Sequence, residues 1–197
     1  MAVGVAGTDK GRQPWLLAMT TAPWNYAASF VADTITALVP LAWWAFFVER
    51  ASGTLWVLVS GILTYTLMEY MMHRFMFHGV RAPEVVREGH RNHHRRPESR
   101  NALPFFVSAI ETAVLFAIAV AVLGLSRGAL FTGICAFGYL AYSTVHHLLH
   151  TGAGQRFPLR WLHDVHEVHH RHPKRNFGVT SPLWDIIVGT YTSPTRA

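Results

Sequence analysis

Long blocks of apolar residues alternate with shorter polar stretches along this chain. A helix needs roughly 20 mostly apolar residues to cross a bilayer, and four blocks approach or exceed that length. The blocks run over Tyr26–Val48, Thr54–Met72, Leu103–Leu125 and Ala129–Leu149. Each carries at most one or two ionisable groups before its histidines begin. The pattern therefore predicts an all-α integral membrane protein with four transmembrane helices.

The polar stretches carry most of the positive charge on alternate connections. Seven arginines lie between Arg74 and Arg100, six lysines or arginines follow Thr151, and two precede the first span. Only Arg50 and Arg127 fall in the two short connections. By the positive-inside rule, the N-terminus, the middle loop and the C-terminal segment are cytoplasmic. Membrane topology thus accounts for the net charge of +6, and we expect no nucleic-acid partner.

The 197 residues are enough for one domain, and we expect a single membrane domain over 1–197. Residues 1–22 read as a flexible or surface-lying lead-in, interrupted by Pro14 and Pro23. They do not show the apolar core of a signal peptide, so we expect the first span to direct insertion. The single cysteine, Cys135, lies in the fourth apolar block, and we interpret it as a packing residue.

A histidine-rich pattern, H-x-x-H-H-R-x-P, occurs twice, at residues 90–97 and 166–173. Each copy follows a spaced pair of histidines near the end of an apolar block. Two sets of five histidines thus recur in the same order: His73, His78, His90, His93 and His94, then His146, His150, His166, His169 and His170. Neutral imidazole is the commonest protein ligand for transition metals near neutral pH. We interpret the ten as ligands of a two-metal site formed by two similar halves.

Helix geometry predicts which of these histidines point the same way. Positions i, i+3 and i+4 share a helix face, so each H-x-x-H-H segment is expected to be a short cytoplasmic helix that presents three histidines together. The proline of each repeat then ends the helix. His146 and His150 share a face, whereas His73 and His78, five residues apart, do not. Either the helix loosens after Arg74 or these two histidines bind different metals.

Other ionisable residues lie near the histidines. Glu69 is one turn before His73 inside an apolar block, where a carboxylate is costly and usually functional. It either accepts the ring N–H of a ligand and orients it, or pairs with Arg74. Three cytoplasmic carboxylates are open to an orienting role or to an ordinary surface role: Asp164, Glu167 and Asp185. Three histidines we interpret as surface or supporting residues and not as ligands: His147, His163 and His172.

All-imidazole ligation suits iron, copper or zinc. We favour two iron ions, with zinc as a substitute acquired on purification, because the site is large and lies at a membrane face where acyl chains and reductants meet. Iron with O2 supplies an oxidant strong enough for inert C–H bonds. A metal transport or storage protein is the alternative of another class, but it predicts ligands near the middle of the spans. A membrane zinc hydrolase predicts fewer ligands and an H-E-x-x-H motif, which this chain lacks.

These stretches resemble the fatty acid hydroxylase/sterol desaturase superfamily of membrane di-iron enzymes, and within it the fatty acid 2-hydroxylases. The resemblance covers roughly 67–190. Its matching segments are M-E-Y at 68–70 leading to H-R-F-M-F-H at 73–78, the two H-x-x-H-H segments, G-Y with a following tyrosine before the third histidine pair at 138–150, and N-F-G-V-T-S-P-L-W-D-I-I-V-G-T at 176–190. The last segment is the most discriminating. Two positions depart from the family pattern: Ser143 stands where the family has Asp before the third histidine pair, and Thr151 stands where a further His often follows His150. These departures put in doubt the residues that surround the metal ligands, but not the ten ligands themselves.

The resemblance implies hydroxylation at C2 of a long acyl chain, in a free fatty acid or a fatty acyl amide, with O2 as co-substrate. It carries the ten matched histidines over as the metal ligands. We expect no fused cytochrome b5-like domain, so electrons come from a separate cytochrome b5-like, ferredoxin or reductase partner docked on the basic face. The same machinery acting on a sterol, a carotenoid or another lipid, as hydroxylase or desaturase, stays open. Fifteen arginines against two lysines indicate a GC-rich bacterial genome and hence a bacterial inner membrane.

Overall fold

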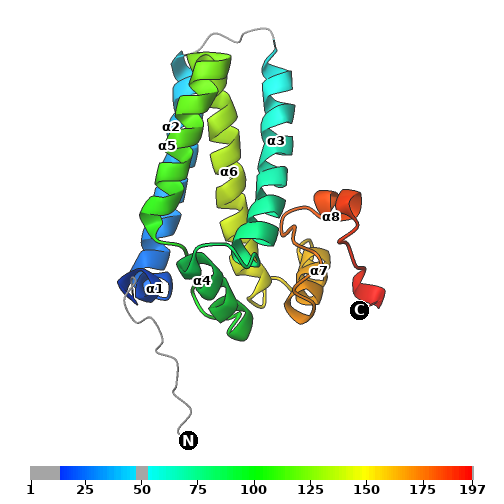
Figure 1. Ribbon diagram of the computed structural model, residues 1–197. Coiled ribbons are helices and arrows are strands. Elements are labelled where there is room, and N and C mark those ends of the chain that lie inside the picture. The colour runs from blue at the N-terminus through cyan, green and yellow to red at the C-terminus, as the bar shows by residue number, and fades with distance from the viewer. Residues whose placement is uncertain (1–13, 48–52, 197) are drawn as a thin grey trace, which may run out of the picture.

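Four long helices form a bundle, and shorter helices cover one end of it (Figure 1). The computed structural model describes residues 14–47 and 53–196. The bundle consists of α2 (Pro23–Phe47), α3 (Thr54–Met71), α5 (Phe105–Leu123) and α6 (Leu125–Leu149). These helices, α3 together with the π-helix that continues it, are long and apolar enough to cross a bilayer. The predicted all-α integral membrane protein with four spans is confirmed.

The shorter elements form a cap at the end of the bundle where α3 and α6 finish (Figure 1). They are α1 (Pro14–Thr20), a π-helix (Met72–Phe77), α4 (Glu84–Arg95), α7 (Arg160–Arg171), α8 (Leu183–Val188) and a 3-10 turn (Pro194–Arg196). Helices α4 and α7 contain the two H-x-x-H-H segments, and each ends two residues before the proline of its repeat, as the sequence predicts.

Helix α6 is central to the bundle, since it contacts α2, α3 and α5. Glycine permits the closest of these approaches. A Cβ atom at Gly138 would lie 2.4 Å from the ring of Tyr65, so only glycine lets this tyrosine of α3 come so near the backbone of α6. Apolar side chains such as Val114, Ile118 and Val122 are exposed on the outside of α5, as a lipid-facing surface requires.

Buried polar side chains of α2 set the position of α5. The side-chain oxygen of Asn25 accepts the backbone N–H of Phe105 at 3.0 Å, and its amide nitrogen donates to the carbonyl oxygen of Leu103 at 3.1 Å. This supplies a partner to the first turn of α5, whose N–H groups have none within the helix. One helical turn further along, the hydroxyl of Ser108 donates to Asp33 at 2.7 Å. These hydrogen bonds hold the start of α5 against α2 and so fix the segment that connects α4 to α5.

The described part of the lead-in is structured, which differs from our expectation. Residues 14–20 form α1, which packs on α4. Thr20 is buried, its carbonyl oxygen accepts the N–H of Ala102, and its side chain lies against Gly89 of α4. The sequence pattern missed this helix because it is short and has no apolar period of its own. Residues 1–13 and the short connection that contains Arg50 lie outside the described residues.

Candidate metal centre

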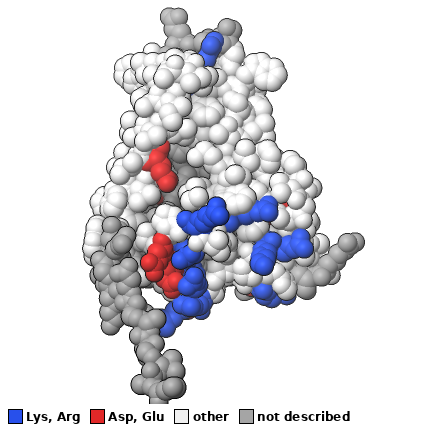
Figure 2. Space-filling model, viewed as in Figure 1, with Lys and Arg blue, Asp and Glu red and all other residues white. Residues whose placement is uncertain are grey.

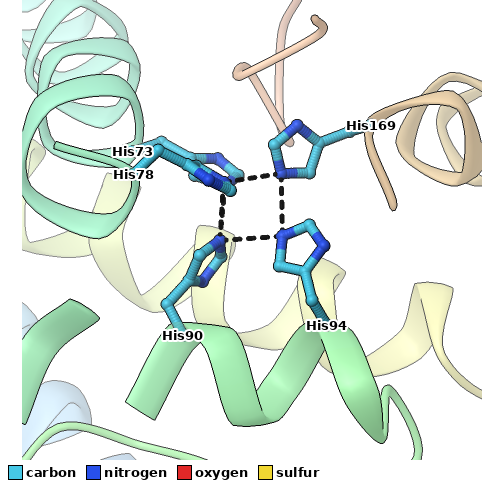
Figure 3. Close-up of side chains that lie close together, drawn as sticks. All are labelled: His73, His78, His90, His94 and His169. Carbon is cyan, nitrogen blue, oxygen red and sulfur yellow. Dashed lines mark hydrogen bonds between the residues drawn. The ribbon is translucent and has the colours of Figure 1, made fainter. Parts of the chain in front are cut away.

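The ten histidines converge in two groups of five between the bundle and the cap. The first group comprises His73, His78, His90, His94 and His169, and the second comprises His93, His146, His150, His166 and His170. Within each group, one ring nitrogen of every histidine lies within 4.8 Å of the others. Figure 3 shows the first group, with rings from the π-helix, α4 and α7 turned toward a common point. The structure thus brings together all ten histidines that the sequence singled out.

The grouping corrects one expectation: the three histidines of each H-x-x-H-H helix do not all point to the same group. His93, from the first half of the chain, lies in the second group, and His169, from the second half, lies in the first group. Successive residues of an α-helix are turned by about 100°. His90 and His94 of α4 are therefore about 40° apart, whereas the ring of His93 points well to one side of both. Helix α7 repeats this with its own histidines, so each helix serves both groups.

His73 and His78 lie in the same group although a regular helix would separate them. Between them the chain forms a π-helix, and the N–H of His78 bonds to the carbonyl oxygen of His73 at 3.2 Å. This i to i+5 bond widens the turn and returns the fifth residue to the face of the first. Of the two alternatives that the spacing left open, the helix loosens after Arg74. π-Helical turns of this kind often occur at functional sites.

The short nitrogen–nitrogen distances in the first group are incompatible with ordinary hydrogen bonding. Nε2 of His90 lies 2.9 to 3.2 Å from the Nε2 atoms of His73, His78 and His94. A ring nitrogen has at most one proton to donate, so most of these contacts bring lone pairs together. Ligand nitrogens about 2.1 Å from a metal and at right angles are about 3.0 Å apart. The spacing therefore fits a set of ligands around one cation.

The second group shows the same convergence. Nε2 of His166 lies 3.0 Å from Nε2 of both His150 and His170. Within the described residues, the Nε2 atoms of His93 and His146 are buried without a hydrogen-bond partner. A buried polar atom without a partner is costly, and a metal ion would satisfy both nitrogens at once. Both groups are compatible with a metal site, as the sequence predicts.

Backbone carbonyl groups orient two of the rings. Nδ1 of His73 donates to the carbonyl oxygen of Phe177 at 2.5 Å, and Nδ1 of His169 donates to that of Arg175 at 2.7 Å. A proton on Nδ1 of a neutral imidazole leaves Nε2 with its lone pair, and Nε2 is the atom that faces the group. The segment around residues 175–177 therefore selects the tautomer that metal binding needs.

Burial keeps these imidazoles neutral. Burial, with a smaller contribution from His94, lowers the pKa of His78 to about 4. Burial and several neighbouring histidines lower the pKa of His150 to about 4 and that of His170 to about 2. The pKa of His169 falls to about 3, chiefly through burial. Because a protonated imidazole has no lone pair to offer, these shifts favour metal binding at neutral pH.

Glu69 has partners other than those expected from the sequence. Its carboxylate accepts hydrogen bonds from the N–H groups of Val179 and Thr180, the hydroxyl of Thr180 and the hydroxyl of Tyr65. It bonds neither to a histidine nor to Arg74 in the described structure. The guanidinium of Arg74 instead donates to the hydroxyl of Tyr70. Glu69 therefore ties the C-terminal segment to α3 and contacts the histidine groups only through that segment.

Asp185 and Asn176 complete this attachment, and the sequence did not reveal their role. The buried carboxylate of Asp185 accepts the N–H groups of Phe177 and Gly178 at 2.9 and 2.7 Å. Asn176, with a positive φ of 52°, donates to the carbonyl oxygens of Val165 and Thr192 and accepts the N–H of Thr192. The backbone at Tyr191 and Thr192, near the C-terminus, is thus held in place. A contact between a side chain and backbone atoms far away in the sequence produces no recognisable residue spacing. The one available signal was that both residues lie in the family-like segment 176–190.

The other candidates stay away from the histidine groups. His147 is 2.8 Å from the hydroxyl of Tyr26 through Nδ1, His163 is 3.0 Å from Asp164, and His172 is on the surface. None of the three belongs to either group within the described residues. Glu167 is half-buried on α7, and its carbonyl oxygen, not its carboxylate, accepts a hydrogen bond from Arg171.

Two cavities lie inside the bundle, and the larger one reaches the histidines. It measures about 130 Å³ and borders His90, His93 and His146 among α2, α4 and α6. The other, about 100 Å³, lies among α3, α5 and α6 and is lined mainly by apolar and aromatic groups. Phe77 and Tyr142 border both cavities. The ring of Tyr142 stacks on His146 at 5.5 Å, and that of Phe77 stacks on His90 at 5.0 Å, so these two rings separate the smaller cavity from the histidines.

Charge is distributed unevenly over the surface. Figure 2 shows Lys and Arg side chains gathered over the cap, while most of the bundle surface on this face is uncharged. An acidic side chain beside a hollow interrupts that uncharged surface (Figure 2). The exposed basic residues of the cap include Arg95, Arg96, Arg171 and Lys174. The cap thus presents a cationic surface next to an apolar belt.

A bundle of membrane-spanning helices capped by ten converging histidines defines an integral membrane protein with a site compatible with metal ions. A family model described as fatty acid hydroxylase matches residues 58–190, which is more than half of the chain. The chain belongs to the fatty acid hydroxylase family, as the sequence motifs indicate.

Curated relatives and a solved structure agree with this assignment. The dihydroceramide fatty acyl 2-hydroxylase FAH2 of Arabidopsis thaliana is 33% identical over 144 residues, which is 68% of this chain and 60% of the relative. The fatty acid 2-hydroxylase of Rattus norvegicus is 27% identical over 188 residues, 89% of this chain and 50% of the relative. The chain thus spans about half to three fifths of the length of these relatives. The solved structure of full-length scs7p, in which only the hydroxylase domain is visible, aligns with a TM-score of 0.66 at 25% identity and covers 93% of this chain and 72% of that one.

Proposed function

We propose that the two histidine groups each bind one iron ion and that the protein is an O2-dependent hydroxylase. The ligands would be His73, His78, His90, His94 and His169 for one ion, and His93, His146, His150, His166 and His170 for the other. The converging lone pairs and the neutral state of the imidazoles support this assignment. Bound iron, with O2 and electrons, supplies an oxidant able to attack unreactive C–H bonds.

We further propose that the substrate is a lipid acyl chain, hydroxylated at C2, in a free fatty acid or a fatty acyl amide. The observation that carries this is the apolar cavity among α3, α5 and α6, which ends at Phe77 and Tyr142 against the histidine rings. A chain entering from the bilayer would be held there with water excluded and its reacting carbon near the site. The relatives named as 2-hydroxylases support position C2.

Electrons would come from a separate protein that docks on the cap. The basic surface of the cap (Figure 2) favours an acidic partner, such as a cytochrome b5-like protein, a ferredoxin or a reductase. The same charge supports a cytoplasmic location for the cap and both termini. The excess of arginine over lysine supports a bacterial inner membrane. The continuous bundle and cap support a single membrane domain over 1–197.

Lipid mass spectrometry of a host that expresses the chain tests the reaction. We expect new 2-hydroxyacyl lipids with the wild type and none with His94→Ala, which removes a ligand from the first group. The matched control is His172→Ala, which removes an exposed histidine and leaves both groups complete. The host should co-express a reductase and a small electron carrier, so that electron supply does not limit the result.

Metal analysis of the same preparations distinguishes the outcomes. We expect iron in the wild type and His172→Ala, and less iron in His94→Ala. A hydroxylated sterol or carotenoid would retain the metal site but contradict the acyl substrate. Iron-loaded, well-inserted protein without any oxidised lipid would contradict the hydroxylase, and a chain that carries iron across the membrane would then be a metal transporter.

A further inference from the structure

Helix α8 presents an aliphatic surface that no other described part of the chain covers. Leu183, Ile186, Ile187 and Val188 are 37, 59, 62 and 48% exposed. Its polar residue Asp185 is fully buried on the opposite side, where it binds the backbone of the preceding loop. Four exposed aliphatic side chains in a helix of six residues are unfavourable in contact with water.

The position of α8 relative to the bundle explains this surface. The indole N–H of Trp184 donates to the hydroxyl of Thr66 at 3.1 Å, and α8 contacts α3. Figure 1 shows α8 beside α3 and nearer to the far end of the bundle than α7, so α8 is the part of the cap that lies against a span. Thr66 precedes His73 by seven residues, which is about 10 Å along a helix axis. After the end of α7, the chain therefore returns about 10 Å into the region of the spans.

Several backbone groups of this segment are bonded within it, which lowers the cost of placing it in lipid. The N–H of Leu183 is bonded to the hydroxyl of Ser181, and the N–H of Ile186 to the carbonyl oxygen of Pro182. Beyond the helix, the N–H groups of Thr190 and Tyr191 both bond to the carbonyl oxygen of Asp185.

We propose that α8 is embedded in the lipid leaflet on the side of the cap, with acyl chains covering Leu183, Ile186, Ile187 and Val188. This surface lies beside exposed apolar residues of α3: Ile62, one helical turn before the Thr66 contact, is 55% exposed. The continuity with a surface that already faces the bilayer distinguishes lipid from a soluble partner as the occupant. Helix α8 is then a re-entrant anchor, separate from the four spans.

The anchor is connected directly to the histidine groups. Asp185 of α8 holds the N–H of Phe177, and the carbonyl oxygen of Phe177 holds the ring of His73. A lipid-embedded α8 therefore fixes the loop behind the histidines at a constant depth relative to the membrane. The proposal itself depends only on the position and exposure of α8, and not on the reaction of the enzyme.

Depth-dependent fluorescence quenching tests the proposal. A single cysteine replaces Ile187 in a Cys135→Ala background, is labelled with bimane and is reconstituted in phospholipid nanodiscs. The quenchers are doxyl groups on the lipid acyl chains and iodide in the water. Matched controls carry the label at Ile118, exposed on the span α5, and at Lys174, exposed in the loop after α7.

We expect the label at Ile187 to behave like that at Ile118, with lipid quenching about fivefold stronger and iodide quenching about fivefold weaker than at Lys174. Iodide quenching equal to that at Lys174 would overturn the proposal. Protection from both quenchers would also overturn it, because protein, such as a second copy of this chain, would then cover α8. If Ile187→Cys does not fold, Ile186→Cys reports on the same surface.

Discussion

Removal of the Asp185 side chain should weaken both the fold and the metal site. This carboxylate is completely buried and accepts three hydrogen bonds, from the N–H groups of Phe177 and Gly178 and from the hydroxyl of Thr190 at 2.7 Å. Asp185→Ala leaves the N–H groups of Phe177 and Gly178 buried without a partner, whereas the hydroxyl of Thr190 keeps the hydroxyl of Tyr70 at 3.2 Å. Each orphaned donor costs about 1–3 kcal/mol, and neighbouring losses add incompletely, so we expect a loss of about 2–5 kcal/mol.

For a chain of this size, that loss lowers the melting temperature by about 10 °C. Asp185→Asn retains one accepting oxygen, so it should lie between wild type and alanine. The loosened Phe177 carbonyl no longer orients the ring of His73, and loss of such support typically costs about 10–100-fold in metal affinity. Both effects come from one carboxylate that touches no histidine.

The assay is thermal unfolding in detergent micelles, with and without metal, combined with metal titration. Asp164→Ala is the matched control, because this side chain is 46% exposed and its carboxylate bonds to His163, which belongs to neither histidine group. The control should unfold and bind metal like wild type. If Asp185→Ala did the same, the loop would not support the metal site and the reasoning would fail.

Three further predictions concern the histidines and the loop behind them. His93→Ala should lower the metal content by about one ion per chain, as measured by elemental analysis, whereas His172→Ala should retain both ions. Equal content in the two variants would contradict the assignment of His93 as a ligand. Gly178→Ala would push a Cβ into the carbonyl oxygen of Ser181 and should lower the melting temperature by several degrees; an unchanged value would mean that the loop yields at little cost. The last prediction concerns chelator-treated protein, in which burial depresses the pKa of His150 in the folded state to about 4. The unfolded chain therefore takes up a proton at higher pH than the folded chain, so the contribution of His150 to stability is complete above about pH 6.5 and is lost as the pH falls toward 4. A melting temperature that rises on acidification would refute this direction of the pH dependence.

The bundle and the ligand candidates were predictable because they depend on local pattern. Blocks of about 20 apolar residues predict spans, and the repeated H-x-x-H-H spacing identifies short helices rich in metal ligands. The allocation of ligands was not predictable. The i, i+3, i+4 rule places His90, His93 and His94 on one broad helix face. His93 is nevertheless turned by about 60° from His90 around the helix axis, and this rotation is enough to direct its ring to the other histidine group.

The roles of Glu69 and Asp185 lay further beyond sequence reasoning. Glu69 sits one turn from His73, so an orienting hydrogen bond to a ligand was a sound expectation. In the folded chain its carboxylate meets Val179 and Thr180, more than a hundred residues away, because the C-terminal segment returns along α3. Backbone N–H groups occur at every non-proline residue, so nothing in the sequence marks which ones a buried carboxylate will bind.

By itself, the sequence determined the class of the molecule: four spans, ten candidate ligands in repeated order, and a family resemblance that the comparisons confirm. These follow from the chain because hydrophobic length and ligand spacing act over a few helical turns. Only the tertiary structure decided that His93 and His169 exchange groups, that a π-helix joins His73 to His78, and that α8 lies against a span. Each of these depends on where separate helices meet, and that position is set by packing between residues far apart in the chain.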